Sequence, residues 1–123
     1  MRYVALISHG PRWRTGRSVF EQGPAMQDHL EAMRRRFDEG SLLLGGPFDG
    51  KGGIAVLDAP DEDAAADVMD TDPGVVAGVL TYELHHLNAY FDAFAGVRAE
   101  ETVAELRWNH GLSASGSEAR RDA

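Results

Sequence analysis

The sequence contains no cysteine among its 123 residues, which excludes disulfide bonds, thiolate nucleophiles and cysteine-ligated zinc sites. A metal site would therefore need histidine and carboxylate ligands. The 5 histidines show neither H-x-H nor H-E-x-x-H spacing. We accordingly expect no metal, although the sequence leaves open whether His9, His85, His86 or His110 contributes to a site.

Positive charge is also scarce, because 12 lysine and arginine residues stand against 20 aspartates and glutamates, a formal net charge of -8 at pH 7. Such a surface repels phosphate backbones and anionic lipids, so we expect neither nucleic-acid nor membrane partners. No apolar run approaches the length of a membrane span, and the run near the N-terminus is too short for a signal peptide. The expected location is cytoplasmic.

The chain does have the composition of a folded domain, with 43% hydrophobic and 26% charged residues. Apolar periodicity and turn residues predict six elements in the order βαββαβ. The strands are expected at residues 3–8, 41–44, 53–58 and 75–87, and the helices at residues 24–39 and 59–70.

Two βαβ halves of this kind form a four-stranded antiparallel sheet with both helices on one face, an α+β arrangement. The other face of the sheet then needs cover, and a second copy of the chain supplies it most simply, as a homodimer. We expect this domain to span residues 1–95, with a C-terminal extension over 96–111 that can clasp the partner. The polar residues 112–123 are expected to form a disordered tail.

The first predicted helix carries a histidine beside its apolar stripe. Met26, Leu30, Met33 and Phe37 recur at helical spacing and are expected to be buried. His29 projects roughly 70° from the centre of that stripe, on its rim. It either lines a cleft or is a surface histidine bonded to water or to the edge of the sheet.

The stretch LGGPFDGKGG, residues 44–53, resembles part of a phosphate-binding loop through Gly45, Gly50 and Lys51. A phosphate loop needs a serine or threonine at position 52 and a helix directly after it, whereas Gly52 and a β-rich run follow here. Nucleotide binding is therefore not expected. The stretch is either a simple hairpin or a turn that presents Asp49 to a ligand.

The loop after the first strand gathers cationic and aromatic residues in an otherwise acidic chain. Arginine side chains bind carboxylates and an indole face covers a flat ring, so the loop can be a lid over an anionic or aromatic small molecule. A solvated loop with paired arginines is the alternative. The expected substrate-binding residues are Arg12, Trp13, Arg14 and Arg17, together with Pro47 and Phe48 of the glycine-rich turn.

Several motifs in order resemble the YCII (YciI-like) family. They are YVALI near the N-terminus, the GPRWRTG insert, HLEAMRRRFDEGSLLLGGPFDGKGG and AADVMDTDPGVVAGVL, and the resemblance covers roughly residues 2–90. It implies a ferredoxin-like α+β fold that forms a dimeric α+β barrel, related in architecture to muconolactone isomerase. It also implies a catalytic His–Asp pair, which falls on His29 and Asp49 in this sequence.

A carboxylate that accepts the Nδ1 proton of an imidazole leaves Nε2 free to take a proton from carbon or oxygen. With His29 as general base and Asp49 orienting it, we expect a lyase or isomerase that acts on an oxygenated small molecule without a cofactor. Two alternatives remain, namely a dimeric binding or accessory protein without turnover and a cofactorless monooxygenase on the same fold.

Overall fold

The chain follows the predicted βαββαβ order in the first of two units, Met1–Asn88 and Ala89–Ala123. The computed structural model describes residues 1–95 and 99–109, so the expected tail at 112–123 and His110 lie outside the described residues. The elements of the first unit are β1 (Arg2–His9), η1 (Val19–Glu21), α1 (Pro24–Glu39), β2 (Leu42–Pro47), β3 (Gly53–Asp58), α2 (Glu62–Asp70), α3 (Pro73–Val76) and β4 (Leu80–Leu87). The second unit contributes η2 (Ala93–Ala95) and α4 (Ala99–Asn109).

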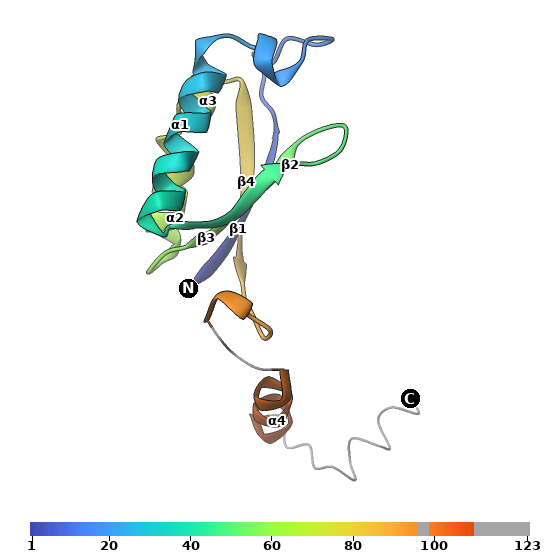
Figure 1. Ribbon diagram of the computed structural model, residues 1–123, viewed down its shortest axis with the longest axis vertical. Coiled ribbons are helices and arrows are strands. Elements are labelled where there is room, and N and C mark those ends of the chain that lie inside the picture. The colour runs from blue at the N-terminus through green and yellow to red at the C-terminus, as the bar shows by residue number, and fades with distance from the viewer. Residues whose placement is uncertain (96–98, 110–123) are drawn as a thin grey trace. The chain divides into compact units, whose positions relative to one another are not determined.

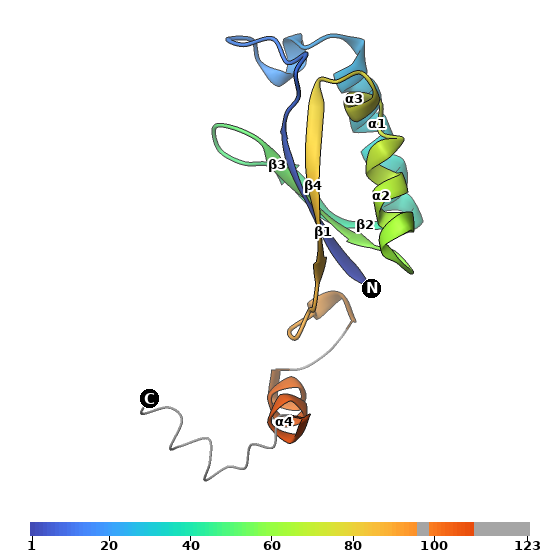
Figure 2. The same cartoon turned by 180° about the vertical axis from the view of Figure 1, so that it is seen from behind.

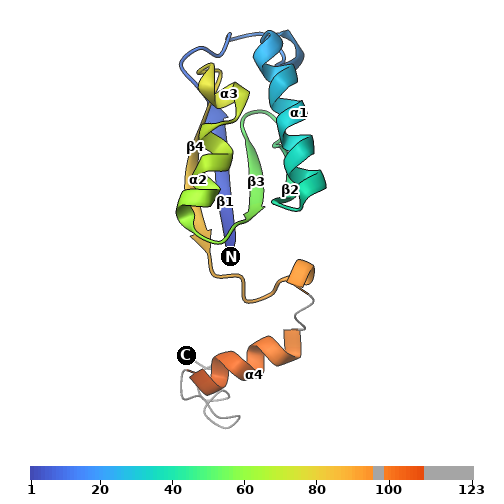
Figure 3. The ribbon, with the colours of Figure 1, turned by 90° about the vertical axis from the view of Figure 1, so that its left-hand side faces the viewer.

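The four strands form one antiparallel sheet in the order β2-β3-β1-β4. Figure 1 shows α1 and α2 on the same face of this sheet, and the view from behind in Figure 2 agrees. In Figure 3 both helices lie in front of the strands. The ferredoxin-like arrangement predicted from the sequence is therefore confirmed.

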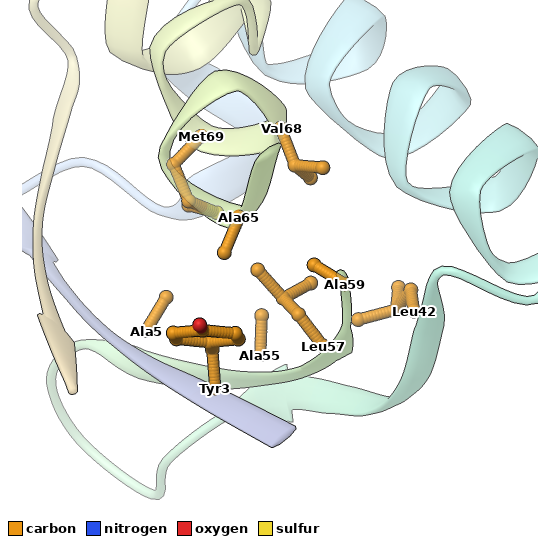
Figure 4. Close-up of a cluster of buried hydrophobic side chains, with 9 residues drawn as sticks. All are labelled: Tyr3, Ala5, Leu42, Ala55, Leu57, Ala59, Ala65, Val68 and Met69. Carbon is orange, nitrogen blue, oxygen red and sulfur yellow. The ribbon is translucent and has the colours of Figure 1, made fainter. Parts of the chain in front are cut away.

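The core lies between the sheet and α2. Tyr3, Ala5 and Leu57 point from the strands toward Ala65 and Met69 of α2, as Figure 4 shows. Ala5, Leu57, Ala65 and Met69 are fully buried. Alanines on both sides let helix and sheet approach closely, which leaves the larger side chains to fill the layer.

The last strand starts later than predicted. Residues 75–87 were expected to be one strand, but Pro73–Val76 form the short helix α3 and β4 begins only at Leu80. Asp72 caps α3, with its side chain accepting hydrogen bonds from Gly74 and Val75, and Pro73 occupies the first turn, where no N–H donor is needed. The segment predicted as one strand, residues 75–87, therefore begins in the helix α3 and ends in the strand β4.

The glycine-rich turn is also shorter than predicted. Gly45 and Gly46 belong to β2, where they pair with Ala55 and Ile54, so the strand continues past residue 44 to Pro47. The turn itself is closed by a 2.8 Å hydrogen bond from Phe48 N to Gly52 O. Gly52 has φ +79°, and a Cβ there would lie 2.7 Å from Ile7 O, so only glycine lets the turn pack against β1.

The buried face of α1 differs from the prediction. Leu30 and Phe37 are 52% and 60% exposed, so the expected stripe is wrong for two of its four members. The less exposed positions are Ala25, Met26, His29, Ala32, Met33 and Arg36. At about 100° per residue, His29 occupies the middle of this face instead of its rim.

The sheet face opposite the helices is apolar along its centre. Strand alternation and the pairing register place Val4, Leu6, Ile54, Val56 and Leu44 on this face. Leu6 and Leu44 are 38% and 58% exposed in the single chain. Within residues 1–95 and 99–109, no helix has the length and apolar character needed to cross a bilayer.

Candidate functional site

His29 of α1 meets a buried carboxylate of α3. Its Nδ1 lies 2.8 Å from Oδ2 of Asp72, and the His29 and Asp72 side chains are 12% and 0% exposed. The two residues are 43 positions apart in the sequence, and the packing of α1 against α3 brings them together. A short bond between side chains this well shielded from water fixes the orientation of the imidazole.

Three donors converge on the same oxygen of Asp72. Oδ2 accepts hydrogen bonds from Gly74 N at 3.0 Å and Val75 N at 3.3 Å in addition to its contact with His29. A Cβ on Gly74 would lie 3.1 Å from Oδ2 and 2.9 Å from Leu80 Cδ1, so glycine leaves room for the carboxylate. The cap of α3 therefore holds Asp72 in place for the histidine.

The arrangement determines which ring nitrogen carries the proton. Because Oδ2 already accepts from two backbone N–H groups, it also faces Nδ1 of His29 as an acceptor, and Nδ1 is the donor. In the neutral ring Nε2 then has a free lone pair, and no described residue forms a hydrogen bond with it. Chemically, such an arrangement can accept a proton at Nε2 while Asp72 holds the ring in one orientation.

The expected pairing of His29 with Asp49 is wrong in this structure, because Asp72 occupies the Nδ1 position. Asp49 is exposed in the turn between β2 and β3, and it forms no ion pair or hydrogen bond with another residue in the described part of the chain. A catalytic role of Asp49 stays a prediction. The sequence analysis gave Asp72 no role beyond its place in a family motif, although an aspartate before Pro-Gly is a typical helix cap.

The loop with the expected substrate-binding residues is ordered by a side chain that the sequence analysis missed. Arg12, Arg14 and Arg17 are exposed, whereas Trp13 packs against the buried cluster of Met26, Val79 and Leu80. The buried Gln22 forms four hydrogen bonds with backbone atoms of residues 14, 17 and 18. No sequence pattern marks a glutamine for this task, because its partners become neighbours only in the folded loop.

The remaining predicted residues lie at the surface. Pro47 and Phe48 are exposed at the end of the β2–β3 hairpin, and their role in binding substrate stays a prediction. His85 contacts Glu83 at 3.4 Å, and the ring of His86 lies against Tyr3 on the other face of the sheet. The described residues contain no group of three or more histidines and carboxylates suited to a metal.

Comparisons with known proteins give a family and a fold. The profile described as the YCII-related domain matches residues 1–88. One protein of similar structure is 5-chloro-2-hydroxyhydroquinone dehydrochlorinase from Burkholderia phenoliruptrix, which was solved in complex with 2,5-dihydroxybenzoquinone. Its TM-score is 0.57, and the sequences are 17% identical over 72% of this chain and 94% of that one. Muconolactone isomerase has a TM-score of 0.55 and 18% identity over 71% of this chain and 88% of that one. No curated protein matches the sequence.

Proposed function

Because this chain belongs to the YCII-related family, whose domain covers residues 1–88, we propose that it is a small enzyme that moves a proton on an oxygenated small molecule. The observation that carries the proposal is the 2.8 Å contact between His29 Nδ1 and Asp72 Oδ2, which leaves Nε2 without a partner among the described residues. His29 is the general base and Asp72 orients it. The proposal keeps His29 from the sequence prediction and replaces Asp49 with Asp72 as the orienting carboxylate.

The chemistry follows from the two ring nitrogens. Nε2 removes a proton from a C–H or O–H group that a neighbouring carbonyl or aromatic ring has made acidic, and Asp72 stabilises the imidazolium through Nδ1. The electron pair left on the substrate then moves into its oxygenated π system. Return of the proton to another carbon completes an isomerisation, whereas departure of a leaving group completes an elimination. Neither route needs a cofactor.

The structural neighbours support this reaction class. One is named as a dehydrochlorinase, which eliminates HCl, and the other as an isomerase. At 17% and 18% identity these proteins share the fold with this chain. They make elimination and isomerisation the first two reactions to assay.

The experiment compares His29→Ala, Asp72→Asn and Asp49→Asn with the unchanged protein. Chloride release from 5-chloro-2-hydroxyhydroquinone measures elimination, and loss of muconolactone measures isomerisation. A positioned base contributes about 10²- to 10⁴-fold in rate, so His29→Ala should lower kcat by at least about 10²-fold. Asp72→Asn should lower it by about tenfold or more because the ring loses its charged partner. Asp49→Asn should change little.

The outcomes separate the alternatives. Loss of activity in Asp49→Asn with full activity in Asp72→Asn would restore the assignment made from the sequence. Ligand binding without turnover in every variant favours a binding protein. Oxygen consumption with either compound would point to a monooxygenase instead.

We further propose that a second copy of the chain covers the open face of the sheet. The support is its central apolar stripe of Val4, Leu6, Ile54, Val56 and Leu44, because a contiguous apolar surface of this kind is typical of an interface. Sedimentation equilibrium should give a dimer, and Leu6→Glu should shift it toward monomer. Leu30→Glu, on the exposed side of α1, is the matched control and should leave the dimer intact.

A further inference from the structure

The loop between β1 and η1 is held at both ends. Gly10 N donates to Val79 O at 2.8 Å and Arg12 N to Gly78 O at 2.9 Å, which continues the pairing of β1 with β4 beyond the strand. Further along, Gln22 holds the backbone of residues 14, 17 and 18. A loop fixed in this way presents its side chains in a defined arrangement, as a recognition loop must.

Two rings of this region stack on each other. The His9 and Trp13 ring centroids are 3.6 Å apart and their planes differ by 6°. Trp13 also packs against the buried cluster that includes Met26, which lies one helical turn before His29. The stacked pair therefore belongs to the same end of the molecule as the proposed base.

The turn between β2 and β3 brings a cation toward this pair. Gly53 pairs with Ile7 in the β1–β3 ladder, so the turn that carries Lys51 continues alongside the end of β1. The close approach of Gly52 to Ile7 O keeps the turn there. Burial, followed by the charge of Lys51, lowers the pKa of the His9 imidazole, in agreement with the position that the strand register gives the lysine.

The segments that border the stack carry two cations, Arg12 and Lys51, and one carboxylate, Asp49, which shares the turn with Lys51. Arg12 extends along Gly78, since a Cβ on that glycine would lie 3.4 Å from both Cγ and Cδ of the arginine. Neither Arg12 nor Lys51 forms an ion pair within residues 1–95 and 99–109. Two unpaired cations against one carboxylate leave a local excess of positive charge in a chain whose net charge is -8, and this excess attracts anions.

We infer that Lys51 and Arg12, beside the His9–Trp13 stack, form a subsite for the anionic group of a flat cyclic substrate, a carboxylate or an ionised ring hydroxyl. The inference rests on the proposed function, since it concerns the substrate of the same site. Lys51 determines the preference for a charged ligand, and the rings contact its apolar plane. The subsite positions the substrate and takes no proton from it.

Two probe molecules that differ only in charge test the subsite. They are 2,5-dihydroxybenzoate and its neutral methyl ester, each titrated calorimetrically into the full chain. The protein should prefer the carboxylate, and Lys51→Ala should weaken carboxylate binding about tenfold, the order of one charge-assisted hydrogen bond. Ester binding should stay unchanged. Arg34→Ala, an exposed cation of α1, is the control and should leave both affinities within about twofold.

Lys51 also offers a direct probe, because it is the only lysine in the sequence. Reductive methylation with ¹³C-formaldehyde labels Lys51 and the N-terminal amine and preserves their charge. Addition of 2,5-dihydroxybenzoate should shift the Lys51 signal in a saturable way and leave the N-terminal signal in place. The ester should shift neither.

Equal affinity of Lys51→Ala and the unchanged protein for the carboxylate would overturn the inference, and so would a lack of preference for the carboxylate over the ester. His29→Ala separates this result from the proposed function. If that variant loses turnover but retains the charge preference, both proposals stand. If it retains turnover and the charge preference, only the assignment of the base fails.

Discussion

Removal of either member of the buried His29–Asp72 pair should lower the free energy of unfolding by an amount that follows from the burial of the two side chains. The Asp72 side chain is fully buried and that of His29 is 12% exposed, so neither group regains water when its partner is removed. A hydrogen bond to a charged group contributes about 1.5–3 kcal/mol, and breaking a buried pair costs about 3–5 kcal/mol. We expect His29→Ala to cost about 2–4 kcal/mol, within that span.

Asp72→Ala should cost a similar amount for a partly different reason. It removes the partner of His29 and also the cap of α3, and loss of a cap costs about 1 kcal/mol. In the double variant, no buried polar group of this pair is left without its hydrogen-bond partner. Its destabilisation should therefore fall short of the sum of the single changes by about 1–3 kcal/mol, the usual coupling of directly contacting residues.

Urea denaturation followed by far-ultraviolet circular dichroism measures all four proteins, at one protein concentration because association adds to stability. Gln27→Ala, an exposed position two residues before His29, is the control and should change stability by less than about 0.5 kcal/mol. Additive single changes, with coupling of about zero, would show that the short contact contributes nothing and would remove the basis for Asp72 as the orienting group.

Two further predictions concern the turn and the sheet. Gly52→Ala should destabilise the chain by about 1–3 kcal/mol, because φ is +79° and the new Cβ would meet Ile7 O at 2.7 Å. Gly46→Ala is the control and should be nearly neutral, because a Cβ there meets nothing within 4 Å. Equal melting temperatures of the two variants would contradict this prediction. Burial raises the pKa of Tyr82, and the hydrogen bond with Asp70 and the negative charge of Asp70 raise it further, to about 12. The unfolded chain therefore releases this proton first, near pH 10, so stability should fall as the pH rises from about 10 to 12. Tyr82→Phe should make urea midpoints less dependent on pH in that range, and an unaltered dependence would count against the shift.

Local patterns were enough to predict much of the fold. Alternation and turn residues located the strands at Arg2–His9 and Gly53–Asp58, and helical periodicity located α2, whose Ala65, Val68 and Met69 are buried. These features depend on neighbours within a few residues, so the sequence carries them directly. The order of the elements then allowed few topologies.

Periodicity was a poorer guide on α1. It counts Leu30 and Phe37 as apolar and assigns them to the core, yet they are 52% and 60% exposed. A helix rotates to bury the face that fits its neighbours, and here small side chains at Ala25 and Ala32 flank His29 in the packed layer. The pattern shows that one side of α1 is buried, but it does not show which residue lies at the centre of that side.

The sequence by itself limited the chemistry that can be proposed: the lack of cysteine excludes thiolate nucleophiles, and the family resemblance singled out His29 as the expected base. Only the tertiary structure decided its partner. Asp49 was an expectation drawn from family resemblance, whereas Asp72 lies 43 residues from His29 and faces it only when α1 packs beside the capped turn of α3. Hydrogen bonds depend on distances of a few tenths of an ångström, and packing sets such distances between segments that no local pattern connects.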